Sequence, residues 1–178
     1  MRSTTSSSTP ALNFEQTDMG GRAKSLPPVR GSMEQVISKI RKNASEEIWV
    51  SFTEYAGQTR LDLRIFFRSA DVPQPKATRK GISLELRQVP ELLAALKRFA
   101  QSSLSGTEVI SKNKSNDIHI YSASFAERQL VHVLTFYRED LDAVPKPSPK
   151  GIAFDESLLD RLIEAVARAE RERKKIQA

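Results

Sequence analysis

The chain has 178 residues, and its 28 lysines and arginines exceed its 22 acids, which gives a formal charge of +6 and an isoelectric point near 9.7. This balance favours a polyanionic partner such as nucleic acid, and no apolar run approaches the ~18 residues that a membrane span needs. Cysteine is absent, which excludes disulfides, thiol nucleophiles and Cys-ligated metal sites and suits a reducing interior.

The first 32 residues differ in composition from the rest of the chain. They begin MRSTTSSSTP and contain Gly20-Gly21 and Pro27-Pro28, with few apolar side chains spaced to form a face. Such a segment cannot offset its ordering entropy by burial. We therefore predict that residues 1–32 form a disordered tail. No continuous apolar stretch follows Arg2, so a secretory signal is not expected.

The remaining sequence repeats itself at an offset of 70 residues. The tripeptide Lys80-Gly81-Ile82 falls on Lys150-Gly151-Ile152, and Phe66-Phe67-Arg68 falls on Phe136-Tyr137-Arg138. The match runs without a gap from about residue 47 to residue 98. Upstream, VISK occurs twice, at 36–39 and at 109–112, with a different spacing. We interpret this pattern as a tandem duplication, with units at 33–100 and 101–178.

Each unit is predicted to contain strands followed by a helix. In the first unit, apolar residues alternate at 48–52 and 61–65 around a turn at 56–58, and a Pro-containing loop at 71–77 precedes a short strand at 81–84. The second unit repeats this order, with a Pro-rich loop at 143–149, and residues 101–116 hold its start. Its helix has apolar residues at helical spacing from Leu158, with Asp155 and Ser157 as candidate caps. The first unit's helix carries Pro90 in its first turn.

The fold class that follows is α+β. A sheet of about four strands with one helix is small for independent folding, so we expect the units to pair through their helices. Leu159, Leu162, Ile163 and Val166 should pack against the face around Leu92, Leu93 and Leu96. The sequence leaves open whether this pairing occurs within one chain or between two chains.

The motifs that carry catalysis are not found. The only histidines, His119 and His132, lie in predicted strands, and the chain has no GxSxG, GxxxxGK[ST] or HExxH motif. We therefore expect a protein that is not an enzyme and that needs neither a metal nor another cofactor.

A binding surface of aromatic and basic residues is the stronger candidate. In the first unit, aromatic side chains are interleaved with basic ones, a mixture that binds single-stranded nucleic acid through base stacking and phosphate contacts. These residues are Trp49, Tyr55, Arg64, Phe66, Phe67, Arg68, Arg79 and Lys80. Strand alternation should bury one of Phe66 and Phe67 and expose the other. An ordinary solvated face remains the alternative explanation for the basic residues.

The segment WVSFTEYAGQTRLDLRIFFR, followed by PKATRKGISL, resembles the core of the Positive Cofactor Four family of transcriptional coactivators. The resemblance covers about residues 47–99 and is weaker in the second unit. It implies a curved four-stranded antiparallel sheet backed by a helix, dimerisation through the helices, and binding of single-stranded or melted DNA along the sheet.

The resemblance also implies roles for individual residues. Tyr55 and Phe67 would stack on bases, and Arg64, Arg79 and Lys80 would contact phosphates. Trp49 would belong to the same nucleic-acid-binding surface. The second unit would use Phe125, Tyr137 and Lys150, with Arg128 as compensation in its turn. Because Leu134 stands in place of the middle-strand arginine and Pro149 in place of the arginine beside Lys150, the second unit should bind more weakly.

The sequence therefore predicts a single-stranded-DNA-binding coactivator or nucleoid-associated regulator, formed as an intramolecular pseudo-dimer or a homodimer, with the transcription machinery as a partner. It would be intracellular, in the cytoplasm or nucleoid of a bacterium or in the nucleus of a eukaryote. A helix-mediated protein assembly module and an RNA-binding protein of the same fold remain alternatives.

Overall fold

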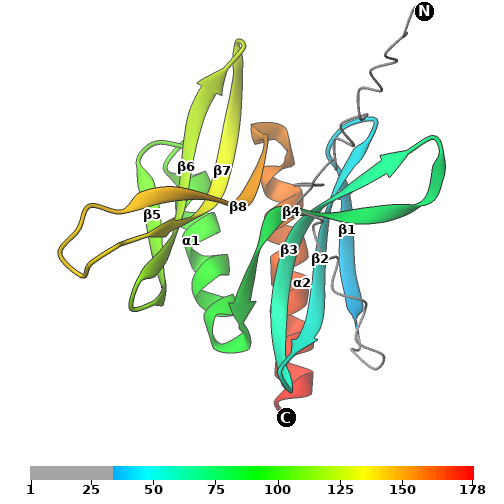
Figure 1. The fold of residues 1–178 in the computed structure, drawn as a ribbon, viewed down its shortest axis with the longest axis horizontal. Helices are drawn as coiled ribbons and strands as arrows, with labels where there is room; N and C mark the ends of the chain where they lie inside the picture. Colours follow the sequence, from blue (N-terminus) through cyan, green and yellow to red (C-terminus); the bar gives the residue numbers. More distant parts are fainter. Residues whose placement is uncertain (1–33) are drawn as a thin grey trace, which may run out of the picture. The chain divides into compact units, whose positions relative to one another are not determined.

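Two four-stranded antiparallel sheets, each followed by a 3-10 turn and an α-helix, make up the fold (Figure 1). The computed structural model describes residues 34–178, so the tail prediction for residues 1–32 lies outside the described residues. The α+β fold class with two successive sheet-and-helix units is confirmed. No helix in this part of the chain is both long and apolar enough to cross a bilayer.

The two units have the same order of elements. The first unit contains β1 (Gln35–Arg41), β2 (Glu46–Tyr55), β3 (Gln58–Ser69), β4 (Val72–Glu85), the turn η1 (Leu86–Gln88) and α1 (Val89–Gln101). The second contains β5 (Thr107–Asn113), β6 (Asn116–Phe125), β7 (Arg128–Tyr137), β8 (Lys146–Asp155), the turn η2 (Glu156–Leu158) and α2 (Leu159–Ile176). Each sheet is a meander in which sequential strands are neighbours.

The predicted Pro-containing loops are wrong in extent. β4 already begins at Val72 and includes most of the segment 71–77, and β8 begins at Lys146. Both strands lie at a sheet edge, where the outward side of the backbone needs no ladder partner. Prolines are therefore tolerated in them, and the proline content did not indicate a loop.

The 70-residue offset extends further upstream than the sequence comparison indicated. Ile40 pairs with Ile48 in the first sheet, and Ile110 pairs with Ile118 in the second. The hairpin tips also match, because the Asn43 Oδ1 accepts from two backbone N–H groups, as does the Asn113 Oδ1. The shifted VISK tetrapeptides thus do not occupy equivalent positions.

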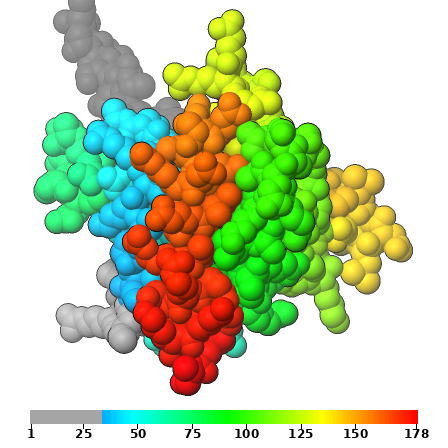
Figure 2. Space-filling view, turned by 180° about the vertical axis from the view of Figure 1, so that it is seen from behind, coloured from blue at the N-terminus to red at the C-terminus, as the bar shows by residue number. Residues whose placement is uncertain are grey.

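Each helix packs against the sheet of the other unit. α2 lies against β1 and β2, α1 lies against β5 and β6, and the two helices pack side by side (Figures 1 and 2). Matching arginines reach across: Arg98 lies 2.8 Å from the Glu108 carboxylate on β5, and Arg168 donates to the Ile37 carbonyl on β1. This exchange, which the sequence did not predict, interlocks the two units within the chain.

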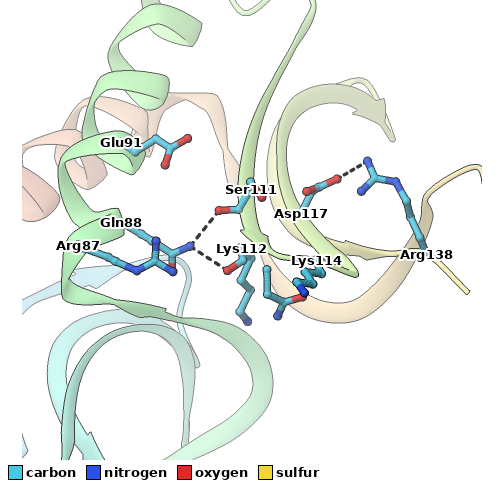
Figure 3. Close-up of a pocket in the computed structure, with 9 residues that line it drawn as sticks. Arg87, Gln88, Glu91, Ser111, Lys112, Lys114, Asp117 and Arg138 are labelled. Atoms are coloured by element: carbon cyan, nitrogen blue, oxygen red, sulfur yellow. Dashed lines mark hydrogen bonds and ion pairs between the residues drawn. The ribbon is translucent and has the colours of Figure 1, made fainter. Parts of the chain in front are cut away.

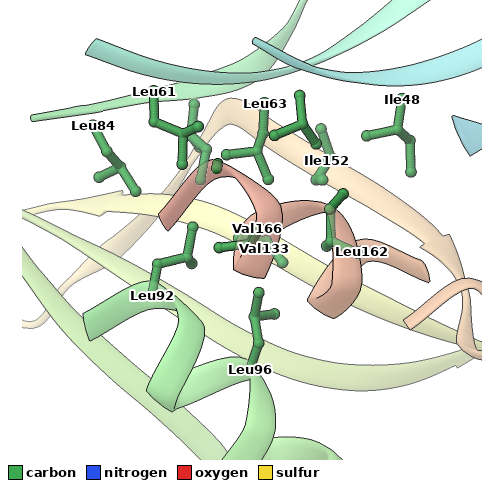
Figure 4. Close-up of a cluster of buried hydrophobic side chains, with 14 of the residues drawn as sticks. Ile48, Leu61, Leu63, Leu84, Leu92, Leu96, Val133, Ile152, Leu162 and Val166 are labelled. Carbon is green, nitrogen blue, oxygen red and sulfur yellow. The ribbon is translucent and has the colours of Figure 1, made fainter. Parts of the chain in front are cut away.

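A single apolar core joins both sheets and both helices. Leu92 and Leu96 of α1 and Leu162 and Val166 of α2 are fully buried (Figure 4). They belong to one cluster with residues of both sheets, namely Ile48, Leu61, Leu63, Leu84, Val133 and Ile152. Leu93 and Ile163 are partly buried against it. The predicted pairing of the units through their helices is therefore confirmed.

The repeated Lys-Gly-Ile tripeptide has a steric cause. A Cβ atom on Gly81 would lie 2.7 Å from the Leu63 carbonyl oxygen, and one on Gly151 would lie 2.5 Å from the Val133 carbonyl oxygen. In both sheets the neighbouring backbone thus passes too close for any side chain.

We expect Gly81→Ala to lower the free energy of unfolding by about 1–3 kcal/mol, the usual cost of overpacking. Gly151→Ala should lower the free energy of unfolding by a similar amount, because a Cβ atom there would also clash with a backbone carbonyl of the neighbouring strand. Urea denaturation of both variants measures the effect. An unchanged midpoint for both would contradict this account of the tripeptide.

Candidate nucleic-acid interface

A row of four residues crosses the centre of the first sheet on the face opposite the core, which we call the outer face. In register, the row is Lys39, Trp49, Arg64 and Gly81. The Lys39 Nζ lies 3.9 Å from the centroid of the Trp49 ring, and Phe66 stacks on the same ring system at 3.9 Å. An ordered aromatic and cationic platform therefore stands at the centre of this face.

Arg64 is held in place by its neighbours. Its guanidinium donates two 2.9 Å hydrogen bonds to the Asp62 carboxylate and one of 2.9 Å to the Thr78 carbonyl. Hydrogen bonding to Asp62 raises the pKa of Arg64, against the opposing effect of burial. Because Asp62 neutralises much of its charge, Arg64 has less capacity for phosphate than the resemblance implies.

A bulge in β4 presents Arg79 and Lys80 to solvent. Arg64 pairs with Gly81 whereas Phe66 pairs with Ala77, so three residues of β4 stand opposite one of β3. The Thr78 hydroxyl fixes this bulge by donating to the Ile65 carbonyl at 2.7 Å. Neither Arg79 nor Lys80 has an ion-pair partner within residues 34–178. Both cations are free for a ligand.

The predicted stacking residues Tyr55 and Phe67 are exposed, at 71% and 45%. They lie at opposite ends of the β2–β3 hairpin, because Tyr55 pairs with Gln58 and Phe67 with Glu46. At ~3.3 Å per residue this separation is about 30 Å. The structure thus places them at the two ends of the hairpin and does not bring them together.

The expectation that one of Phe66 and Phe67 is buried is wrong. Alternation does put them on opposite faces, and Phe67 shares the side of Ile65, which is fully buried. Phe67 is nevertheless exposed, because it stands near the end of the strand, beyond the buried core. Phe66 is half-buried against Trp49 on the outer face.

The second sheet has a different outer face. Its equivalent row is Val109, His119, Leu134 and Gly151, so both cations of the first row are absent. His119 stacks on Phe136 at 3.9 Å, and Tyr121 stacks on His132 at 5.0 Å. The exposed Phe125 and Tyr137 stand at the two ends of the hairpin β6–β7, and Lys150 lies in a bulge of β8 like that in β4.

The two sheets also differ in net charge. The segment 58–85 has six basic and three acidic residues, whereas the equivalent segment 128–155 has four of each. Arg128 is exposed at the second turn. The pKa of Asp155 is lowered first by hydrogen bonds from Ser157 and, to a smaller extent, by the charge of Arg128, so the charges of Asp155 and Arg128 partly offset each other. The first sheet is thus the more attractive surface for a polyanion.

Lys39 and the aromatic stacks on the second sheet were not among the predicted site residues. Lys39 belongs to β1, for which no strand was predicted from residue alternation, and its place over Trp49 depends on the register. At the 70-residue offset, Tyr121 and His132 correspond to Ser51 and Asp62, which pair across β2 and β3. The repeat was therefore the signal that could have placed Tyr121 opposite His132.

Residues 42–95 match the family Transcriptional Coactivator p15 (PC4). The PC4 match spans β2, β3, β4 and the first half of α1, and it contains every predicted binding residue of the first unit. The sequence resemblance is thereby confirmed for this segment. The chain matched no curated protein sequence at a significant level. The PC4 match supports a DNA-binding coactivator role in transcription.

The two histidines predict a pH dependence of stability. Burial lowers the pKa of both His119 and His132 below 6.5, and the nearby Arg138 lowers that of His119 further, against Asp117. The unfolded chain therefore binds protons more readily, and stability should fall as the pH drops below about 6.5. The variant H119F/H132F removes every histidine of the chain and should flatten this fall. Urea denaturation at pH 7.5 and 5.5 measures it, and an unchanged pH dependence in the variant would refute the assignment.

Proposed function

We propose that this protein binds single-stranded or melted DNA along its first sheet and acts, without enzymatic activity or cofactor, on the transcription machinery. The observation that carries the proposal is that the segment matching PC4 combines exposed rings with exposed cations that form no ion pair within the described residues. Tyr55 and Phe67 offer exposed rings at the two ends of the β2–β3 hairpin, and Arg79 and Lys80 are exposed on β4.

The chemistry of this surface favours a single strand over a duplex. Rings can stack only on bases that are not already stacked within a helix, whereas lysines and arginines follow the backbone of any nucleic acid. We propose that the second sheet contributes a weaker binding surface. Its central row has the uncharged Val109 and Leu134 where the first sheet has Lys39 and Arg64, and its net charge is lower.

A salt-series titration of the full chain with fluorescent oligo-dT, the same length of RNA, and duplex DNA tests this function. We expect oligo-dT to bind more tightly than duplex DNA, with an affinity that falls linearly in log salt. Tighter binding of RNA would instead favour the RNA-binding alternative. Failure to bind any of the three at low salt would favour a protein assembly module.

A further inference from the structure

A cavity of about 200 Å³ lies at the β1 edge of the first sheet, between β1 and α2, and we call it the β1–α2 groove. The two elements adjoin on the side of the molecule that Figure 2 shows. Three cations line the groove: Lys39 from β1, and Arg161 and Arg168 from α2. All three are exposed, and none forms an ion pair within residues 34–178.

Glu164 supplies the single carboxylate among the described residues that line this groove. It is exposed and forms an ion pair with none of the three cations, so the lining has three positive charges against one negative charge. Arg161 and Arg168 are seven residues apart, or about 10 Å along the helix axis. A row of cations with this spacing suits the successive charges of an extended polyanion.

The equivalent edge of the second sheet, between β5 and α1, does not carry this charge. At the 70-residue offset, Val109 takes the place of Lys39, and Glu91 takes the place of Arg161. Glu91 lines a separate cavity beside the hairpin β5–β6 (Figure 3). One cation is therefore absent there and another is replaced by a carboxylate, so the positive charge of the groove is not a consequence of the repeated fold.

Arg168 also differs from its counterpart Arg98 in the residue that stands beside it. Arg98 lies 2.8 Å from the Glu108 carboxylate on β5. In the first sheet the position of Glu108 is taken by the uncharged Ser38, which lines the β1–α2 groove. The Arg168 guanidinium donates to the Ile37 carbonyl at 3.4 Å, a contact that leaves its charge uncompensated.

Lys39 connects the groove to the aromatic platform of the first sheet. It lines the groove, and its Nζ lies 3.9 Å from the centroid of the Trp49 ring. A strand that leaves the platform across β1 therefore meets the arginines of α2 next. All three cations of the groove lie outside residues 42–95, so the PC4 match assigns a role to none of them.

We propose that the β1–α2 groove binds the phosphate backbone of a single-stranded nucleic acid and extends the binding path of the first sheet onto α2. Arg161 and Arg168 contact phosphates, and Lys39 links the groove to Trp49. This inference rests on the proposed function. Guanidinium groups donate paired hydrogen bonds to phosphate oxygens, and no carboxylate of the described residues occupies these two arginines.

The test compares R161Q/R168Q with K97Q/R98Q in the full chain, by titration with fluorescent oligo-dT at several salt concentrations. Each variant removes two positive charges from one helix and one arginine contact between the units. We expect R161Q/R168Q to weaken binding roughly tenfold at low salt and to reduce the slope of log affinity against log salt by about 1.4, or about 0.7 for each lost phosphate contact. K97Q/R98Q should bind like the wild type, because Glu108 already neutralises Arg98.

A second variant, S38E, keeps both arginines and places a carboxylate beside Arg168 where Glu108 stands beside Arg98. It should weaken oligo-dT binding in the same direction, and thermal unfolding confirms that each variant folds. If the wild type binds but R161Q/R168Q binds equally well, or if K97Q/R98Q loses as much affinity, the groove is overturned as a binding site and the proposed function stands.

Polyglutamate serves as the competing probe. If it binds the wild type through Arg161 and Arg168 while oligo-dT binding is independent of them, the ligand of the groove is an acidic protein segment and the nucleic-acid assignment is overturned. If the wild type binds no oligonucleotide at low salt, the proposed function itself fails.

Discussion

Leu162→Asp should unfold the protein or bring it close to unfolding. Leu162 is fully buried in the core that joins both sheets and both helices, so the new carboxylate would have no water and no partner. An uncompensated buried charge typically costs about 3–5 kcal/mol, which for a domain of this size lowers the thermal midpoint by roughly 10 °C or more. Circular dichroism during heating measures the shift.

Arg161→Asp is the matched control, because it introduces the same residue one position earlier on the exposed side of α2. We expect its midpoint to stay close to that of the wild type. If Leu162→Asp also melts like the wild type, then α2 does not sit in the core as described.

Tyr55→Ala and Phe67→Ala should each weaken oligo-dT binding by about 1–3 kcal/mol, or about 5- to 150-fold, the usual worth of one stacked base. Both rings lie outside the buried core, so their loss should destabilise the fold less than the ~3–5 kcal/mol typical of a core aromatic. Fluorescence anisotropy gives the affinity, and urea denaturation gives the stability.

The second unit supplies the controls. Phe125 is 72% exposed at the position equivalent to Tyr55, which is 71% exposed, and Tyr137 is equivalent to Phe67. Phe125→Ala and Tyr137→Ala should reduce affinity less, because the sheet around them has no net charge excess. Equal losses from both units would show that the two sheets bind alike. Phe67→Ala that unfolds the chain would assign the ring a structural role.

The strands and helices were predictable because their apolar residues follow simple periods. Ile48, Val50 and Phe52 alternate, and the tripeptide Lys-Gly-Ile recurs where a neighbouring backbone excludes a side chain. The prolines of β4 were misleading, since an edge strand accepts them and local composition does not reveal which strands are edges. The platform of Lys39, Trp49 and Phe66 depends on cross-strand register, which the sequence of one strand does not contain.

The exchange of helices could not be predicted for a different reason. α1 and α2 have similar apolar faces, so either helix could cover either sheet as far as residue pattern is concerned. Arg98 and Arg168 fix the outcome by contacts to strands of the other unit, more than 100 residues away in the case of Arg168 and Ile37. Only the assembled chain distinguishes these two arrangements.

This exchange of helices also determines when, during synthesis, each sheet can be covered. During synthesis the first sheet is complete long before α2, the element that covers its β1 and β2, leaves the ribosome. Its apolar face must therefore stay exposed, or be shielded by other factors, until α2 has been added. Contacts between such distant segments slow folding and prolong exposure to aggregation. A chain truncated before Leu159 should thus expose the apolar face of its first sheet and require a chaperone, although its second sheet has α1 to cover it.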